Sequence, residues 1–133
     1  MYHIKNDKRS ITSANALYRA LIAMLDTRSL DRINVTSLVK KAMVGRSTFY
    51  RNFDEPLDIL QWKCDSLFNH VLQKFSSKLE NGTSGRFSFI REVFGYGRQH
   101  SEVLEVLIAN SRIDVIEGAT KSISDYLKKV DDP

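Results

Sequence analysis

The segment that decides the fold covers residues 33–53 and reads INVTSLVKKAMVGRSTFYRNF. Asn34 can cap a helix that begins at Val35, because its side chain accepts a hydrogen bond from a backbone N–H of the first turn. That helix has one apolar face, formed by Leu38, Val39 and Ala42. We expect it to end after about two turns at residues 43–45, where Gly45 tolerates the backbone conformations that a tight turn demands.

A second short helix is expected to follow at once over residues 46–53. Phe49 and Phe53 are four residues apart, which places both on one helix face, toward the interior. The polar side chains are then expected on the other sides: Arg46, Ser47, Arg51 and Asn52. Two short helices joined by a three-residue turn, after a longer helix, form a helix-turn-helix pattern. In that pattern the N-terminal end of the second helix reaches base edges in the DNA major groove.

Helical spacing of apolar residues extends over the rest of the chain. A first helix is expected to begin at Thr12 or Ser13, either of which can cap it, and to end near residue 25. Further helices are expected at residues 56–79, 86–98, 101–109 and 112–130. Residues 80–85, ENGTSG, form the clearest loop. No alternating apolar pattern predicts a strand, so the expected fold class is all-α.

The excess of positive charge is confined to the first half of the chain. The whole sequence holds 20 Lys and Arg against 16 Asp and Glu, a net charge of +4. Residues 1–65 hold 11 basic and 7 acidic side chains, whereas residues 66–133 hold 9 of each. Five basic residues and no acidic residue lie from Arg32 to Asn52. Such a segment is typical either of a surface that binds a polyanion or of a solvated face.

The helix-turn-helix segment resembles the DNA-binding module of TetR-family (TetR/AcrR-type) transcriptional regulators. Ala42 and Val44 match a small residue and a valine of the family pattern, and Phe49-Tyr50 with Phe53 match its closing aromatic element. The resemblance covers about residues 10–62. It implies a three-helix DNA-binding domain at residues 1–54, followed by a long connecting helix. It also implies a small helical body within residues 55–133 that binds a small-molecule effector and forms a homodimer on a palindromic operator.

The expected contacts with double-stranded DNA follow from this resemblance and from side-chain chemistry. Arg46 is the expected base reader, because arginine pairs bidentately with guanine. Ser47 and Thr48 either contact bases and phosphates or cap the helix through their hydroxyls. Tyr50 matches a family position that reaches a phosphate, and its ring can also belong to the core. The remaining expected contacts are Thr36, Ser37, Lys40, Lys41, Gly45 and Arg51.

The sequence also departs from the family pattern. Ser29 and Met43 stand where glycine is usual, and Pro56 stands where a phosphate-binding lysine is common. Asp54 and Glu55, just before Pro56, would repel phosphate. The chain is shorter than typical members, which leaves the helical body reduced or incomplete. These departures favour an alternative function, a TetR-like adaptor or co-regulator that acts through protein–protein contacts.

No arrangement of residues predicts an enzyme, a cofactor or a metal site. His3, His70 and His100 are scattered without metal-ligand spacing, and the glycines do not fit a phosphate-binding loop. The single cysteine, Cys64, lies on the apolar stripe of the helix expected at residues 56–79. We therefore interpret Cys64 as a buried structural thiol in a reducing cytoplasm.

An effector pocket is expected in the helical body, lined by Trp62, Phe94 and Tyr96. The observation behind it is the segment 94–97, FGYG, which interrupts a helical pattern with two glycines. A locally irregular helix in an ordinary core explains the same segment.

The longest apolar runs fall short of the roughly 18 residues that span a membrane, so a cytoplasmic protein is expected. The resemblance implies a transcriptional regulator, most often a repressor in this family.

Overall fold

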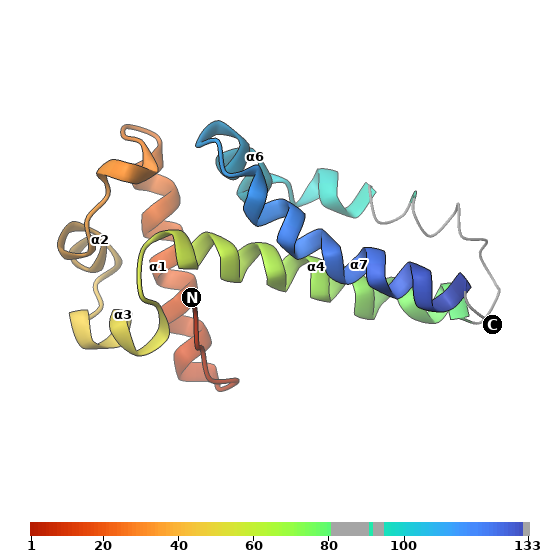
Figure 1. Cartoon of the computed structure of the whole chain (residues 1–133). Coiled ribbons are helices and arrows are strands. Elements are labelled where there is room, and N and C mark those ends of the chain that lie inside the picture. Colours follow the sequence, from red (N-terminus) through yellow and green to blue (C-terminus); the bar gives the residue numbers. More distant parts are fainter. Residues whose placement is uncertain (81–90, 92–94, 132–133) are drawn as a thin grey trace. The chain divides into compact units, whose positions relative to one another are not determined.

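The computed structural model describes residues 1–80, 91 and 95–131. It divides into two compact units, Met1–Lys63 and Cys64–Pro133. The described residues are predominantly helical, which confirms the all-α class (Figure 1). The elements are α1 (Lys8–Leu25), η1 (Leu30–Arg32), α2 (Val35–Ala42), α3 (Arg46–Asn52), α4 (Leu57–Glu80), α6 (Glu102–Ala109) and α7 (Ile113–Asp131).

Helix α1 begins earlier than its apolar pattern predicts. Its cap is Asp7, whose carboxylate accepts a hydrogen bond from the Ser10 backbone N–H at 2.8 Å. This bond also lowers the pKa of the Asp7 carboxyl. The prediction of a cap at Thr12 or Ser13 is therefore wrong. The added first turn begins with charged residues, so apolar spacing could not reveal it.

The two short helices form as expected, except that α3 ends at Asn52, one residue before its expected end at Phe53. Asn34 caps α2 by accepting a hydrogen bond from the Ser37 N–H at 2.8 Å, as predicted. The turn after α2 differs from the prediction. Met43, at φ 60° and ψ 40°, takes the left-handed conformation, whereas Gly45 has φ −82°. The Val44 N–H bonds to the Val39 carbonyl at 3.1 Å, which closes the helix end around Met43.

Replacing Met43 with glycine is expected to stabilise the first unit. The Met43 side chain is 91% exposed, so its removal sacrifices little packing. The left-handed conformation costs a non-glycine residue about 1–2 kcal/mol, and glycine avoids this cost. Glycine loses more conformational entropy on folding, however, which offsets part of the gain. We therefore expect the free energy of unfolding in urea to rise by about 0.5–1 kcal/mol. A lower free energy for Met43→Gly than for the native chain would contradict this account.

The core of the first unit is built from α1, α2, α3 and the start of α4. Phe49 and Phe53 are fully buried, which confirms their predicted inward orientation. Their ring centroids lie 5.8 Å apart. Further fully buried side chains come from all of these helices: Leu17, Leu21, Leu38, Ile59 and Leu60. Figure 1 shows α2 and α3 alongside α1 within this unit.

Asn52 was predicted to face outward, and this prediction is wrong. The residue is 2% exposed, and its side-chain amide donates a hydrogen bond to the Thr48 carbonyl at 3.1 Å. Asn52 lies three residues after Phe49 and hence on the same side of α3. The N-terminal arm, residues 1–6, also bonds to it, since the His3 N–H donates to the Asn52 carbonyl at 2.9 Å.

Asp58 joins the N-terminal arm to the beginning of α4. Its buried carboxylate accepts hydrogen bonds from the Asp54 and Glu55 N–H groups, both at 2.9 Å. The Met1 ammonium lies 2.8 Å from the same carboxylate and 3.5 Å from Asp54. The His3 ring lies 3.3 Å from the Asp54 carboxylate. The carboxylates of Asp54 and Asp58 are therefore both in contact with the arm.

The attachment of the arm is expected to weaken at both ends of the pH range. The hydrogen bond from His3 lowers the pKa of the Asp54 carboxyl from 3.8. The stabilisation that this contact gives to the attached arm is therefore complete above pH 3.8 and is lost as pH falls through the lowered pKa. The hydrogen bond to Asp58 raises the pKa of the Met1 ammonium from 8.0. The stabilisation from the Met1–Asp58 contact is complete below pH 8.0 and is lost as pH rises through the raised pKa of the ammonium.

Carboxyl carbon NMR shifts recorded against pH check this prediction. The Asp54 titration midpoint is expected below 3.8, and the His3→Ala variant is expected to move it back up. An Asp54 midpoint that is the same in the native chain and in His3→Ala would show that the His3 contact does not hold the arm.

The second unit contains the rest of α4 together with α6 and α7. The expected helices at 56–79, 101–109 and 112–130 are confirmed with boundaries shifted by about one residue. Helices α6 and α7 pack together, with Val103, Leu107 and Ala119 buried. Of the helix expected at 86–98, residues 91 and 95–98 are helical, and the others lie outside the described residues, as do residues 81–85 of the expected loop.

Candidate functional site

Three of the predicted DNA-contacting residues form a cluster that joins α2 to α3. The Arg46 guanidinium donates a hydrogen bond to the Thr36 hydroxyl at 2.6 Å. The same guanidinium lies 5.7 Å from the centre of the Tyr50 ring, in cation–π range. We call Arg46, Thr36 and Tyr50 the Arg46 cluster. All three residues are exposed, so the cluster presents an oriented guanidinium to solvent.

The Arg46 cluster is attached to the core through an aromatic contact. The Tyr50 ring meets the buried Phe49 ring edge-on, with centroids 5.0 Å apart and an interplanar angle of 90°. Tyr50 nevertheless remains 46% exposed. The residue thus packs on the core with one part of its ring and faces solvent with another, so both roles considered for it are compatible with its position.

The remaining predicted residues of α3 lie around the cluster. Ser47 and Arg51 are exposed, as predicted, and Thr48 is half-buried. Gly45 is the residue before α3, and no side chain caps the start of this helix. Ser47 and Thr48 therefore do not cap α3 through their hydroxyls, which was one of the two roles considered for them. Gly45 itself is exposed, and a Cβ there would meet the Ser47 hydroxyl oxygen at an ordinary 3.8 Å.

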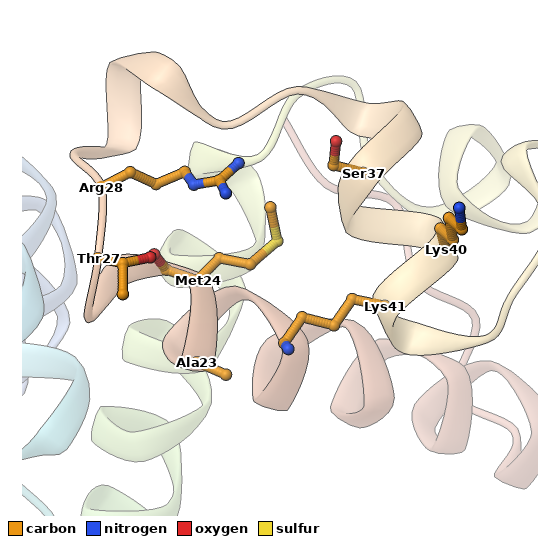
Figure 2. Close-up of a pocket in the computed structure, with 7 residues that line it drawn as sticks. All are labelled: Ala23, Met24, Thr27, Arg28, Ser37, Lys40 and Lys41. Carbon is orange, nitrogen blue, oxygen red and sulfur yellow. The ribbon is translucent and has the colours of Figure 1, made fainter.

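The other predicted residues of α2 line an open pocket beside the end of α1. The pocket has a volume of about 490 Å³. Its lining residues are Ala23, Met24, Thr27, Arg28, Ser37, Lys40 and Lys41 (Figure 2). We call it the basic pocket. Ser37, Lys40 and Lys41 were predicted as DNA contacts, and the structure brings them together with two residues that sequence analysis missed, Thr27 and Arg28.

The charge of the basic pocket is entirely positive. Arg28, Lys40 and Lys41 are exposed, and no acidic residue lines the pocket. Within the described part of the chain, none of these three cations makes an ion pair. Lys40 and Lys41 also lie in the last turn of α2, where the helix dipole favours positive charge. The sequence signal for Arg28 was weak, because Asp31 separates it from the acid-free segment.

The three residues proposed to line an effector pocket occupy different surroundings. Trp62 belongs to the first unit, where its ring packs 6.2 Å from that of Phe53. Tyr96 belongs to the second unit, where its ring lies 4.3 Å from that of His100 and 5.5 Å from that of His70. Phe94 lies outside the described residues. The effector pocket therefore stays a prediction.

Cys64 is fully buried, as predicted from its place on the apolar stripe of α4. Burial raises the pKa of its thiol to about 12. The thiol is then protonated at neutral pH, which is the unreactive form of cysteine. A structural role for this side chain agrees with both observations.

No protein-family model, no curated protein and no solved structure matches the chain. Across the described ranges 1–80, 91 and 95–131, no three His, Cys, Asp or Glu side chains gather where they could hold a metal ion. Within those same residues, no helix has both the length and the apolar character needed to cross a membrane.

Proposed function

We propose that the chain is a helix-turn-helix DNA-binding protein that regulates transcription, with α3 entering the major groove. The observation that carries this proposal is the Arg46 cluster. Arg46 is the first residue of α3, and its guanidinium is held by the Thr36 hydroxyl of α2 and the Tyr50 ring. An arginine at the leading end of a recognition helix can pair bidentately with a guanine.

The surroundings of the Arg46 cluster supply the sequence-independent part of DNA binding. Lys40, Lys41 and Arg51 are exposed on α2 and α3. Cations placed this way attract phosphates and fix the protein on the duplex without reading bases. Asp54, which would repel phosphate, lies 3.3 Å from the His3 ring and 3.5 Å from the Met1 ammonium. These contacts reduce the repulsion that its position before α4 would otherwise cause.

The resemblance to TetR-type regulators supports a finer proposal. In it, the protein is a ligand-responsive repressor that binds a palindromic operator as a homodimer. An effector bound in the second unit would lower operator affinity, which is a coupling between two binding equilibria. Two-fold symmetry would place the two recognition helices about one DNA turn apart.

Binding to random-sequence duplex DNA at increasing salt tests the proposed function. Each phosphate neutralised by the protein contributes about −0.9 to the slope of the logarithm of the association constant against the logarithm of salt concentration. Contacts from Lys40, Lys41 and Arg51 alone therefore predict a slope of about −2.7 per chain. Fluorescence anisotropy with a labelled duplex measures this slope.

Charge-neutralising variants sharpen the salt experiment. Lys40→Gln, Lys41→Gln and Arg51→Gln are each expected to reduce the slope by about one unit. Lys121→Gln is the matched control, because Lys121 is an exposed residue of α7 in the second unit. A flat salt dependence for the native chain would overturn the proposal and favour the alternative function, an adaptor that acts through protein–protein contacts.

A further inference from the structure

We propose that the basic pocket binds a small phosphorylated molecule. The pocket lies between the end of α1 and α2, within the first unit, and its volume of about 490 Å³ falls in the range of small-ligand sites. The pocket shares Lys40 and Lys41 with the proposed DNA contacts, but binding of a small ligand there does not require DNA binding and does not involve the Arg46 cluster.

The arrangement of the cations favours a phosphate group. Figure 2 shows the Arg28 side chain extending toward α2 and the Lys41 side chain extending toward α1, so the two approach the pocket from opposite sides. Arginine presents a planar fork of N–H donors that matches phosphate oxygens, and lysine adds a point charge. The lining holds three cations and no acidic residue, so its net positive charge attracts a multiply charged anion.

The uncharged lining residues favour a phosphorylated organic molecule over a bare anion. The Thr27 hydroxyl donates its hydrogen to the Met24 carbonyl at 3.3 Å, so its oxygen is available as an acceptor. An acceptor suits a ligand hydroxyl and not a phosphate oxygen. The side chains of Ala23 and Met24 add apolar surface that a carbon skeleton can contact. The cations of the pocket thus suit a phosphate group, and its uncharged residues offer polar and apolar contacts to the rest of an organic ligand.

Titration with pyrophosphate at constant ionic strength tests the proposal. Phosphorus NMR follows the probe, and amide shifts of Thr27, Arg28 and Ser37 follow the pocket. We expect saturable binding with amide shifts concentrated at the lining residues. Arg28→Gln and Lys41→Gln are each expected to weaken pyrophosphate binding by about tenfold. Arg19→Gln is the control, since Arg19 is an exposed cation of α1 that does not line the pocket.

The same variants distinguish a small phosphorylated ligand from a phosphate of the DNA backbone. Each is also tested for binding to random duplex DNA. Weaker pyrophosphate binding in Arg28→Gln, together with saturation in the native chain, supports the proposal whether or not DNA binding is observed. Equal pyrophosphate binding by Arg28→Gln, Lys41→Gln and Arg19→Gln would overturn it. Loss of duplex affinity without any saturable pyrophosphate binding would also overturn it and assign the pocket to DNA.

Discussion

Replacing Arg46 with alanine is expected to lower affinity for a selected duplex site by roughly 5- to 150-fold, which corresponds to about 1–3 kcal/mol. The guanidinium is exposed on α3, so its loss does not disturb the core. In Arg46→Ala, water can replace the guanidinium as the partner of the exposed Thr36 hydroxyl, so the lost hydrogen bond leaves no unpaired buried group. The expected loss therefore comes from the missing base contact.

The measurement requires a duplex enriched from random sequence by repeated binding to the native chain. Affinity for that duplex and for an unrelated one is then compared between the native chain and Arg46→Ala. A base-reading role predicts that the preference for the selected duplex falls much more than the salt slope does. Equal preference in both proteins would remove Arg46 from the role of base reader.

Two further variants separate the charge of Arg46 from its orientation. Arg46→Lys retains the charge but loses the bidentate fork, so it is expected to behave much like Arg46→Ala on the selected duplex. Thr36→Val retains Arg46 but removes the hydroxyl that holds it at 2.6 Å. We expect a smaller loss in Thr36→Val, because the guanidinium must then be ordered on binding. A Thr36→Val affinity equal to that of the native chain would show that this hydrogen bond contributes no preorganisation.

The sequence predicted the helices wherever local signals agreed with one another. At α2, the Asn34 side chain and the apolar face after it gave the same start, and the structure confirms both. At α1, the first turn is polar, so the apolar pattern could not indicate where the helix begins, and the cap is Asp7. At the turn, glycine content pointed to Gly45, but the closing hydrogen bonds of α2 place the left-handed residue at Met43. Backbone geometry overrode residue preference there.

Long-range contacts explain what the sequence could not show. Asn52 is buried beside the N-terminal arm, whose pairing with the end of α3 no local pattern predicts. The basic pocket likewise forms only when the end of α1 meets α2, which brings Arg28 to Lys40 and Lys41. In the same way, the three residues of the Arg46 cluster were predicted individually, but their mutual contacts follow from the packing of α2 against α3.

Replacing Phe49 with alanine is expected to lower the free energy of unfolding of the first unit by about 3–5 kcal/mol. Phe49 is fully buried, and its ring contacts those of Phe53 and Tyr50 at centroid distances of 5.8 and 5.0 Å. The loss combines the transfer free energy of the ring, the cavity left behind and two aromatic contacts. Because small domains are stable by only about 5–15 kcal/mol, urea unfolding followed by Trp62 fluorescence should show a large shift.

Phe49→Leu keeps most of the buried volume and is the variant that links stability to recognition. We expect it to cost less than Phe49→Ala and to leave the unit folded. It removes the edge-on ring against which Tyr50 packs, and Tyr50 in turn lies beside the Arg46 guanidinium. Folded Phe49→Leu should therefore bind the selected duplex more weakly than the native chain, with an unchanged salt slope. Native affinity in this folded variant would mean that Phe49 supports only the core and that Arg46 is positioned by Thr36 alone.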